Sequence, residues 1–150
     1  MEIALRQAYK GCKRGDGGPF GCCVVKGGQV IACGHNTVLK DNDPIAHAEI
    51  NAIRRAAKQL KTWNLKKCQI YTTTEPCPMC FSAISWARID KIVYGTTIKD
   101  AQKLGFNEML INSARMKRLA SLNIKIEKGF MREECQCLLD FWKKLRLKVY

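Results

Sequence analysis

The residues best suited to chemistry lie in two short segments, HAE at 47–49 and EPCPMC at 75–80. Cys77 and Cys80 are three residues apart at the start of a predicted helix, so both thiols project from one side of its first turn. Unpaired amides at a helix start favour negative charge, and a bound cation deprotonates a coordinating thiol. With His47, the two thiolates give zinc three protein ligands and leave a fourth position open, as in catalytic sites. The sequence therefore predicts one catalytic Zn²⁺ per chain.

Glu49 favours a catalytic zinc over a structural one. Residues two apart on a regular helix differ by about 200° in direction, so His47 and Glu49 reach one centre only where a helix begins. Pro44, three residues before His47, is typical of such a start. A carboxylate there can take a proton from a water acidified by the metal and deliver it to a leaving group, which predicts hydrolytic deamination. The alternatives are a cysteine pair packed as small apolar residues with a histidine that is satisfied elsewhere, or a zinc used only for folding. The presence of both segments, 47–49 and 75–80, argues against them.

The first half of the chain predicts a β-hairpin followed by a helix. Apolar runs at 20–26 and 29–34 are joined by the glycines at 27–28, a strong two-residue turn signal. Residues 46–60 show helical periodicity, so a helix should begin near His47. The predicted apolar face of this helix consists of Ile50, Ile53, Ala57 and Leu60.

The second half alternates between strands and helices. The predicted elements are a strand at 68–74, a short helix at 77–88, a strand at 91–97, a helical run at 108–119, an exposed strand at 123–128 and a closing helix from 131. The strands before and after the short helix should run parallel, because a crossover connects them. We therefore predict an α/β fold, a three-layer α/β/α arrangement with a mixed five-stranded sheet, in a single domain spanning 1–150.

Composition limits the class of protein further. The chain of 150 residues has nine cysteines, an odd number that a closed disulfide framework would not use fully, so we expect a reducing cytoplasmic location. The longest uncharged stretch, residues 27–39, is too short to span a membrane, which predicts a soluble protein. The net charge of +13 favours a solvated basic face over a nucleic-acid site, because the sequence has no long block of Lys and Arg.

Two other groupings look like half of a metal site. Cys33 and His35 flank a glycine, and Cys135 and Cys137 flank a glutamine. Neither has a complementary pair at ligand spacing, so we interpret them as ordinary buried thiols or loop residues.

The segments HAE and PCPMC resemble the H-x-E and P-C-x-x-C signature of the zinc nucleobase and nucleoside deaminases, which implies a cytidine deaminase-like fold. Within that superfamily PFGCCVV, NDPIAHAEINAIRRA and DAQKLGFNE are most similar to bacterial-type guanine deaminases, and the resemblance covers nearly the whole chain. It implies hydrolytic deamination of guanine to xanthine and ammonia. The alternatives are a tRNA adenosine deaminase, which forms inosine at the wobble position and shares HAE and EPCPMC, and a zinc-stabilised binding module without catalysis.

The resemblance also implies a pocket for a purine base. It matches Asn36 to an asparagine at the end of the second strand, Glu108 to an acidic position that is more often aspartate, and Tyr150 to a C-terminal aromatic that closes the site. A carboxylate suits guanine, whose N1–H and N2 amine are both donors on one edge. The predicted substrate-binding set, with Phe20 or Trp86 for stacking, is Asn36, Glu108, Phe20, Trp86, Ala48 and Tyr150.

The expected partners follow from the same resemblance. They are a small-molecule purine base and a second copy of the chain in a homodimer, possibly with exchanged C-terminal segments. Transfer RNA is the alternative partner, and no membrane is expected.

Overall fold

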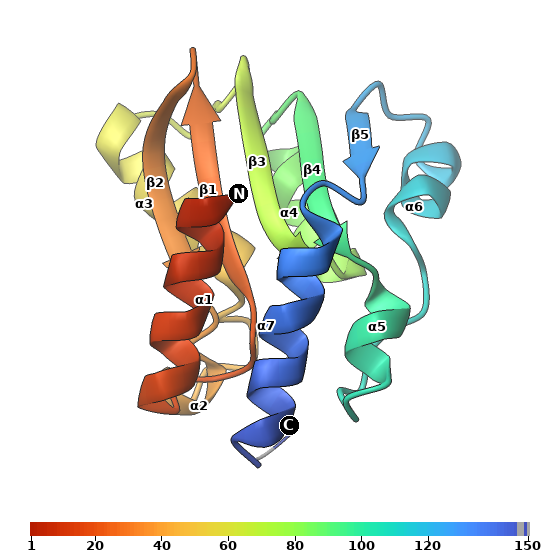
Figure 1. Cartoon of the computed structure of the whole chain (residues 1–150). Helices are drawn as coiled ribbons and strands as arrows, with labels where there is room; N and C mark the ends of the chain where they lie inside the picture. The colour runs from red at the N-terminus through yellow and green to blue at the C-terminus, as the bar shows by residue number, and fades with distance from the viewer. Residues whose placement is uncertain (147–148, 150) are drawn as a thin grey trace.

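The computed structural model describes residues 1–146 and 149. Figure 1 shows its elements, which are α1 (Glu2–Arg14), β1 (Gly21–Lys26), β2 (Gln29–His35), α2 (Val38–Asp41), α3 (Ala48–Leu60), β3 (Cys68–Thr74), α4 (Pro78–Trp86), β4 (Lys91–Thr96), α5 (Ile98–Gln102), α6 (Ser113–Leu119), β5 (Lys125–Lys128) and α7 (Arg132–Lys144). Within these described residues, no helix combines the length and apolar character needed to cross a membrane.

The five strands form one mixed sheet in the order β2-β1-β3-β4-β5, which confirms the predicted α/β fold with a mixed five-stranded sheet. β1 pairs antiparallel with both β2 and β3, whereas β3, β4 and β5 run parallel. The hairpin turn depends on Gly27 and Gly28, whose φ angles of 56° and 79° lie in the left-handed region that glycine adopts without strain. The carboxyl ends of β3 and β4 therefore meet at one edge of the sheet.

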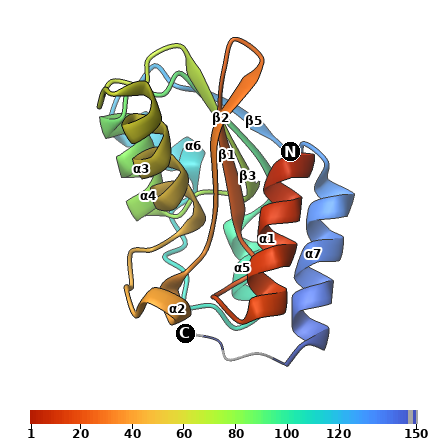
Figure 2. The ribbon, with the colours of Figure 1, turned by 90° about the vertical axis from the view of Figure 1, so that its left-hand side faces the viewer.

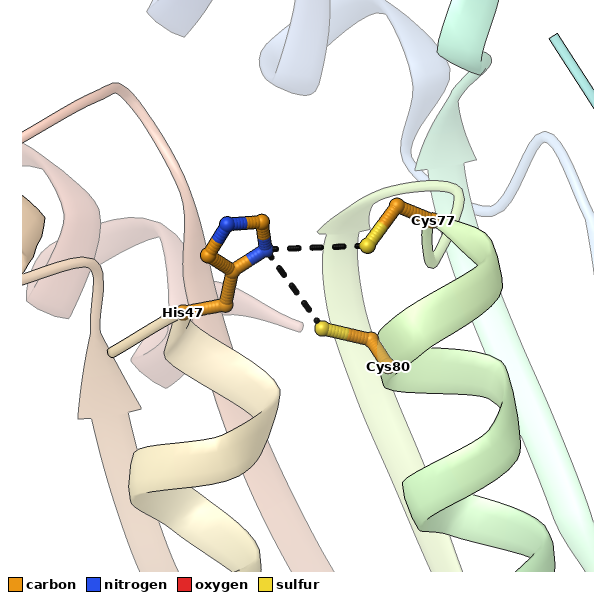
Figure 3. A group of neighbouring side chains, drawn as sticks. All are labelled: His47, Cys77 and Cys80. Carbon is orange, nitrogen blue, oxygen red and sulfur yellow. Dashed lines mark hydrogen bonds between the residues drawn. The ribbon is translucent and has the colours of Figure 1, made fainter. Parts of the chain in front are cut away.

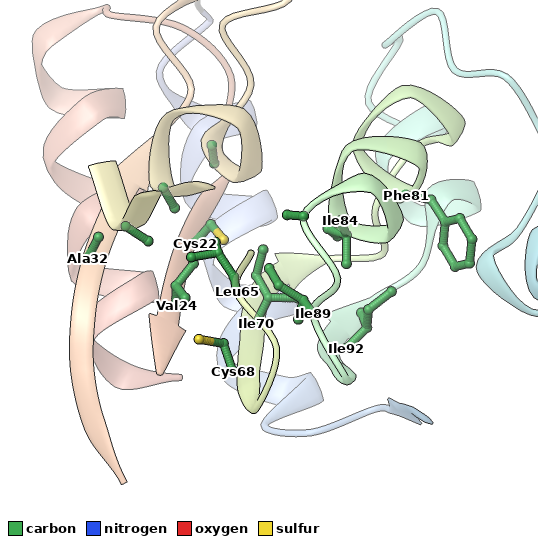
Figure 4. Close-up of a cluster of buried hydrophobic side chains, with 14 of the residues drawn as sticks. Cys22, Val24, Ala32, Leu65, Cys68, Ile70, Phe81, Ile84, Ile89 and Ile92 are labelled. Carbon is green, nitrogen blue, oxygen red and sulfur yellow. The ribbon is translucent and has the colours of Figure 1, made fainter. Parts of the chain in front are cut away.

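Helices cover both faces of the sheet, with α3 and α4 on one side and α1 and α7 on the other (Figure 2). The larger core lies between the sheet and the α3–α4 layer and includes Leu65, Ile70, Phe81, Ile84 and Ile92 (Figure 4). Burying one such side chain stabilises the fold by about 1.5–3 kcal/mol. This packing fixes where α3 and α4 begin relative to the sheet.

The buried face of α3 differs from the predicted one. Its fully buried residues are Ala48, Ala52 and Ala56, one turn apart, together with Glu49 at 6% exposure. The predicted face of Ile50, Ile53, Ala57 and Leu60 is only half-buried. The reason is that α3 packs very close to β2. The approach is so close that a Cβ atom added to Gly34 would lie 2.7 Å from the carbonyl oxygen of Ala48. Small residues allow this contact, and the larger side chains pack to either side.

The segment after α5 also differs from the prediction. Residues 108–112 are irregular, and α6 begins only at Ser113. Asn112 caps the helix by accepting a 2.8 Å hydrogen bond from the amide of Arg115. The predicted start at Glu108 was therefore too early, and Glu108 lies in a loop.

Candidate active site

Three potential metal ligands meet where α3 and α4 begin. The ligand atoms of His47, Cys77 and Cys80 all lie within 4.8 Å of one another. His47 Nδ1 is 3.7 Å from Cys77 Sγ and 3.5 Å from Cys80 Sγ (Figure 3). Tetrahedral zinc, with Zn–S about 2.3 Å and Zn–N about 2.05 Å, requires an N···S separation of about 3.6 Å. The donor set and its spacing therefore fit Zn²⁺.

Both helix starts aim these ligands at one point. His47 is the N-cap of α3 and Cys77 the N-cap of α4, each with extended backbone angles. Pro78 occupies the first turn of α4, where its missing amide costs no hydrogen bond. The free amides of two helix N-termini thus face the cluster and favour thiolates there.

Asn51 holds the entry to α3 in place. Its Nδ2 lies 2.9 Å from the carbonyl oxygen of His35, 2.9 Å from Thr37 Oγ1 and 3.3 Å from the carbonyl oxygen of Ala46. One amide therefore ties the end of β2 to the residue before His47. The sequence prediction missed Asn51, although its position one turn after His47 could have indicated a supporting role.

The cluster is electrostatically suited to a cation. A hydrogen bond from Cys80, followed by the hydrogen bond and charge of His47, lowers the pKa of Cys77 to about 4 against the opposing effect of burial. Burial lowers the pKa of His47, but its hydrogen bond to Cys77 and the nearby negative charges outweigh burial and raise it. These hydrogen bonds and charges therefore favour the thiolate form of Cys77 beside His47.

Glu49 lies beside the cluster, buried in the first turn of α3. Its Oε1 is 3.1 Å from Thr72 Oγ1, and its Oε2 is 3.4 Å from Cys80 Sγ. Burial, followed by the negative charge of Cys77, raises the pKa of Glu49. Thr72 Oγ1 is also 3.0 Å from the carbonyl oxygen of Thr74, so its single proton can point to either acceptor. The carboxyl group can thus be stabilised with or without its proton.

A recess of about 20 Å³ lies beside Glu49, His47 and Cys77. This volume is sufficient for a single water, which needs about 10–15 Å³. Its lining residues are Phe20, His47, Glu49, Thr74, Glu75, Cys77 and Glu108. The recess provides room for one small group in contact with both the ligands and the buried carboxyl.

A wider cavity of about 400 Å³ opens outside this recess. The lining residues are Phe20, Val38, Pro44, His47, Cys77, Pro78, Met79, Phe106, Asn107, Glu108 and Met109. The Phe20 ring packs edge-on against Phe106 at a centroid distance of 5.0 Å, and Phe106 contacts Trp142 of α7 at 4.9 Å. Burial, followed by the negative charge of Cys77, raises the pKa of Glu108 to about 7. The cavity therefore combines aromatic walls with one carboxyl group near the ligands.

Asn36 has 1% of its surface exposed and is bonded to Val38, a residue of the cavity wall. Its Oδ1 accepts hydrogen bonds from the amides of Gly18, at 3.3 Å, and Val38, at 3.1 Å. Its Nδ2 is buried and has no hydrogen-bond partner among the described residues. Because Oδ1 is held by two amides, the unpaired Nδ2 group has a defined direction.

Trp86 and Ala48, like Asn36, are not among the residues that line the cavity. Trp86 is 76% exposed at the last residue of α4, about 12 Å along the helix from Pro78, which places it away from the cavity. Ala48 is fully buried against β2 and is not a lining residue. Tyr150 lies outside the described residues.

Glu75 is a second residue that sequence reasoning missed. Its buried carboxylate accepts hydrogen bonds from the amides of Ser113, at 2.8 Å, and Ile98, at 3.3 Å. These amides are at the two ends of the segment that carries Glu108. Glu75 is part of the EPCPMC motif, but partners 23 and 38 residues away cannot be deduced from local pattern.

His35 does not belong to a metal site in the described part of the chain. Its Nε2 is 2.8 Å from Asp16 Oδ2, and both side chains are buried. The Asp16 carbonyl oxygen accepts a 2.9 Å hydrogen bond from the amide of Lys40. The pair thus fastens the loop before β1 to the end of β2, next to Asn36.

Comparisons with known proteins agree on one family. The family model of the cytidine and deoxycytidylate deaminase zinc-binding region matches residues 1–96. Guanine deaminase of Bacillus subtilis (strain 168) is 47% identical over 111 residues, which are 74% of this chain and 71% of that protein. A tRNA-specific adenosine deaminase of Buchnera aphidicola is 38% identical over 148 residues, 97% of this chain and 93% of that protein. The solved structure of guanine deaminase from Nitrosomonas europaea matches this chain with a TM-score of 0.87 at 29% identity. The match covers 95% of this chain and 82% of the Nitrosomonas chain.

Proposed function

This chain belongs to the cytidine and deoxycytidylate deaminase family of zinc-dependent hydrolytic enzymes, and we propose that its substrate is guanine, which it converts to xanthine and ammonia. His47, Cys77 and Cys80 would hold the zinc ion. When bound, zinc supplies Lewis acidity that makes water a nucleophile near neutral pH. The remaining steps depend on side chains of the cavity and its recess.

Glu49 moves the proton in this proposal. Its carboxylate takes a proton from the water that attacks C2 of guanine and delivers it to the N2 amine, which leaves as ammonia. The oxygen of the water remains on C2, so guanine and water give xanthine and ammonia. Thr72 supports both protonation states, because its hydroxyl can donate to the carboxylate or turn toward the carbonyl oxygen of Thr74.

Glu108 and the aromatic wall select the base. The carboxylate of Glu108 would accept a hydrogen bond from N1–H, beside the reacting C2, while the Phe20 ring packs against the purine face. This contact needs the ionised form of Glu108, which a cation held by His47, Cys77 and Cys80 would favour. The Nδ2 group of Asn36 would donate to an acceptor of the base, which removes the cost of leaving it unpaired, about 1–3 kcal/mol.

The observation that carries the proposal is the carboxyl group of Glu108 on the wall of a cavity shared with His47 and Cys77. A carboxylate beside the ligands favours a base whose edge presents donors. Adenine presents an unprotonated N1 acceptor beside its reacting carbon, so an ionised Glu108 would repel it.

Deamination of adenosine in tRNA is the second candidate. It is favoured by the 38% identity to a tRNA-specific enzyme over 97% of this chain and by the net charge of +13. A tRNA enzyme should bind more weakly as salt rises, because each neutralised phosphate releases counterions, whereas turnover of a neutral free base should respond little.

Replacing Glu108 by Gln tests the guanine proposal. The amide presents a donor where guanine presents one, so we expect kcat/KM for guanine to fall at least about tenfold, equivalent to about 1.4 kcal/mol of transition-state stabilisation. Zinc content should stay the same. Glu127→Gln, the same change at a partly exposed ion pair with Lys91, is the matched control and should behave as the parent. Unchanged xanthine formation by the Glu108 variant would remove guanine recognition from this cavity.

A further inference from the structure

Two cysteines outside the zinc site lie in direct contact across the β1–β2 hairpin. Cys23 Sγ and Cys33 Sγ are 2.9 Å apart, and the two residues are directly opposite in the strand register. Both are free thiols, with Cys23 at 2% exposure and Cys33 half-buried. Because the two sulfur atoms are already this close, only a small movement of the side chains is needed to form a covalent S–S bond.

The register gives this pair a suitable backbone spacing. The amide of Asn36 donates a 3.0 Å hydrogen bond to the carbonyl oxygen of Phe20, which puts these two residues in the position of a hydrogen-bonded pair. Hydrogen-bonded and non-hydrogen-bonded pairs alternate along an antiparallel ladder. Cys23 and Cys33 are three pairs further along than Phe20 and Asn36, so they form a non-hydrogen-bonded pair. Such pairs have Cα atoms about 4.5 Å apart, within the range of about 4.4–6.8 Å that disulfides require.

The pair lies on the face of the sheet opposite to the zinc site. Cys22, the preceding residue, belongs to the core below α3, so Cys23 points toward α1. Cys23 lines a cavity of about 400 Å³ whose wall includes Met1 and Glu2. Burial, followed by the contact with Cys33, raises the pKa of Cys23. A small molecule in this cavity would therefore lie next to Cys23 and outside the catalytic cavity.

We propose that Cys23 and Cys33 are a reversible redox modification site that forms an intrachain disulfide by exchange with a low-molecular-weight disulfide. The more exposed Cys33, as thiolate, attacks one sulfur of the small disulfide, forms a mixed disulfide and releases one small thiol. Cys23 then loses its proton and attacks Cys33 Sγ, which releases the second small thiol. The two protein thiols are oxidised by two electrons, and the small disulfide is reduced to two thiols.

This disulfide would connect two strands that are already paired. It constrains the unfolded chain, so the oxidised protein should melt at a higher temperature than the reduced protein. Zinc content should not change, because His47, Cys77 and Cys80 lie beyond the other face of the sheet.

Peptide mapping tests the proposal on the zinc-loaded full chain. The protein is treated with oxidised glutathione, its remaining thiols are alkylated under denaturing conditions, and trypsin is added. Cleavage after Arg14, Lys26 and Lys40 separates peptide 15–26, with Cys22 and Cys23, from peptide 27–40, with Cys33. We expect these two peptides to remain joined by a bond that a reductant breaks, with a mass lower by two hydrogen atoms.

Substitutions identify which thiols react. The link should persist in Cys22→Ala, the matched control on the same peptide, and be absent in Cys23→Ala and Cys33→Ala. Separate peptides in the oxidised parent, glutathione retained on Cys33, or a link that survives Cys23→Ala would each overturn the proposal. The parent's own map decides the first two outcomes even if a variant does not fold.

Discussion

Replacing Glu75 by Gln should reveal how strongly one buried carboxylate holds the segment that carries Glu108. The carboxylate accepts hydrogen bonds from the amides of Ser113 and Ile98, at 2.8 and 3.3 Å. Gln retains one acceptor oxygen but turns an NH₂ group toward the other amide. The change loses a bond to a charged acceptor, worth about 1.5–3 kcal/mol, and leaves a buried donor unpaired, so we expect a total cost of about 2–4 kcal/mol.

Chemical denaturation of the zinc-loaded protein measures this cost. For a chain of this size the loss corresponds to roughly 4–16 °C in Tm. KM for guanine should also rise, because both ends of the loop that carries Glu108 lose an anchor. Glu127→Gln is again the control, since its partly exposed ion pair with Lys91 is worth about 1 kcal/mol or less. Equal stability losses in the two variants would refute the anchoring role of Glu75.

Three further perturbations separate metal binding, catalysis and folding. Glu49→Ala should keep about one zinc per chain but lose deamination by roughly 10²–10⁴-fold, so near-normal turnover would exclude the proton shuttle. Cys80→Ala should lose zinc and melt earlier, by metal analysis and calorimetry. Burial raises the pKa of Asp100, but hydrogen bonds from Thr97 and the ion pair with Arg132 outweigh burial and lower it below 3.8. The parent should therefore be more stable than Asp100→Asn above about pH 4, and this difference in unfolding free energy should disappear as the pH falls through the lowered pKa of Asp100. A difference that stays constant during acid titration would contradict this.

Much of the architecture follows from local pattern. The hairpin was predictable because Gly27 and Gly28 are the residues that a tight turn with two positive φ angles needs. The parallel strands were predictable because a crossover helix leaves few other arrangements. The meeting of His47, Cys77 and Cys80 then follows, since both helices begin at the same edge of the sheet.

Other features depend on distant contacts that no short window contains. The alanine face of α3 is selected by the close approach of Gly34, so hydrophobic periodicity indicated the wrong face. Trp86 has a suitable side chain for stacking, but it stands at the far end of α4 from the cavity. The contact between Cys23 and Cys33 needs the strand register, which the turn alone does not reveal. The homodimer with exchanged C-terminal segments and the closure by Tyr150 remain predictions.

Substrate identity is tested most directly by one parallel assay. Zinc-loaded protein is incubated with free guanine and, separately, with tRNA that has adenosine at the wobble position, and the products are separated by chromatography at low and high salt. Guanine should give xanthine and an equal amount of ammonia, with little dependence on salt, and Glu49→Ala should give neither. Inosine from the tRNA, formed more slowly as salt rises and with no xanthine from guanine, would contradict the guanine assignment and support the tRNA enzyme instead.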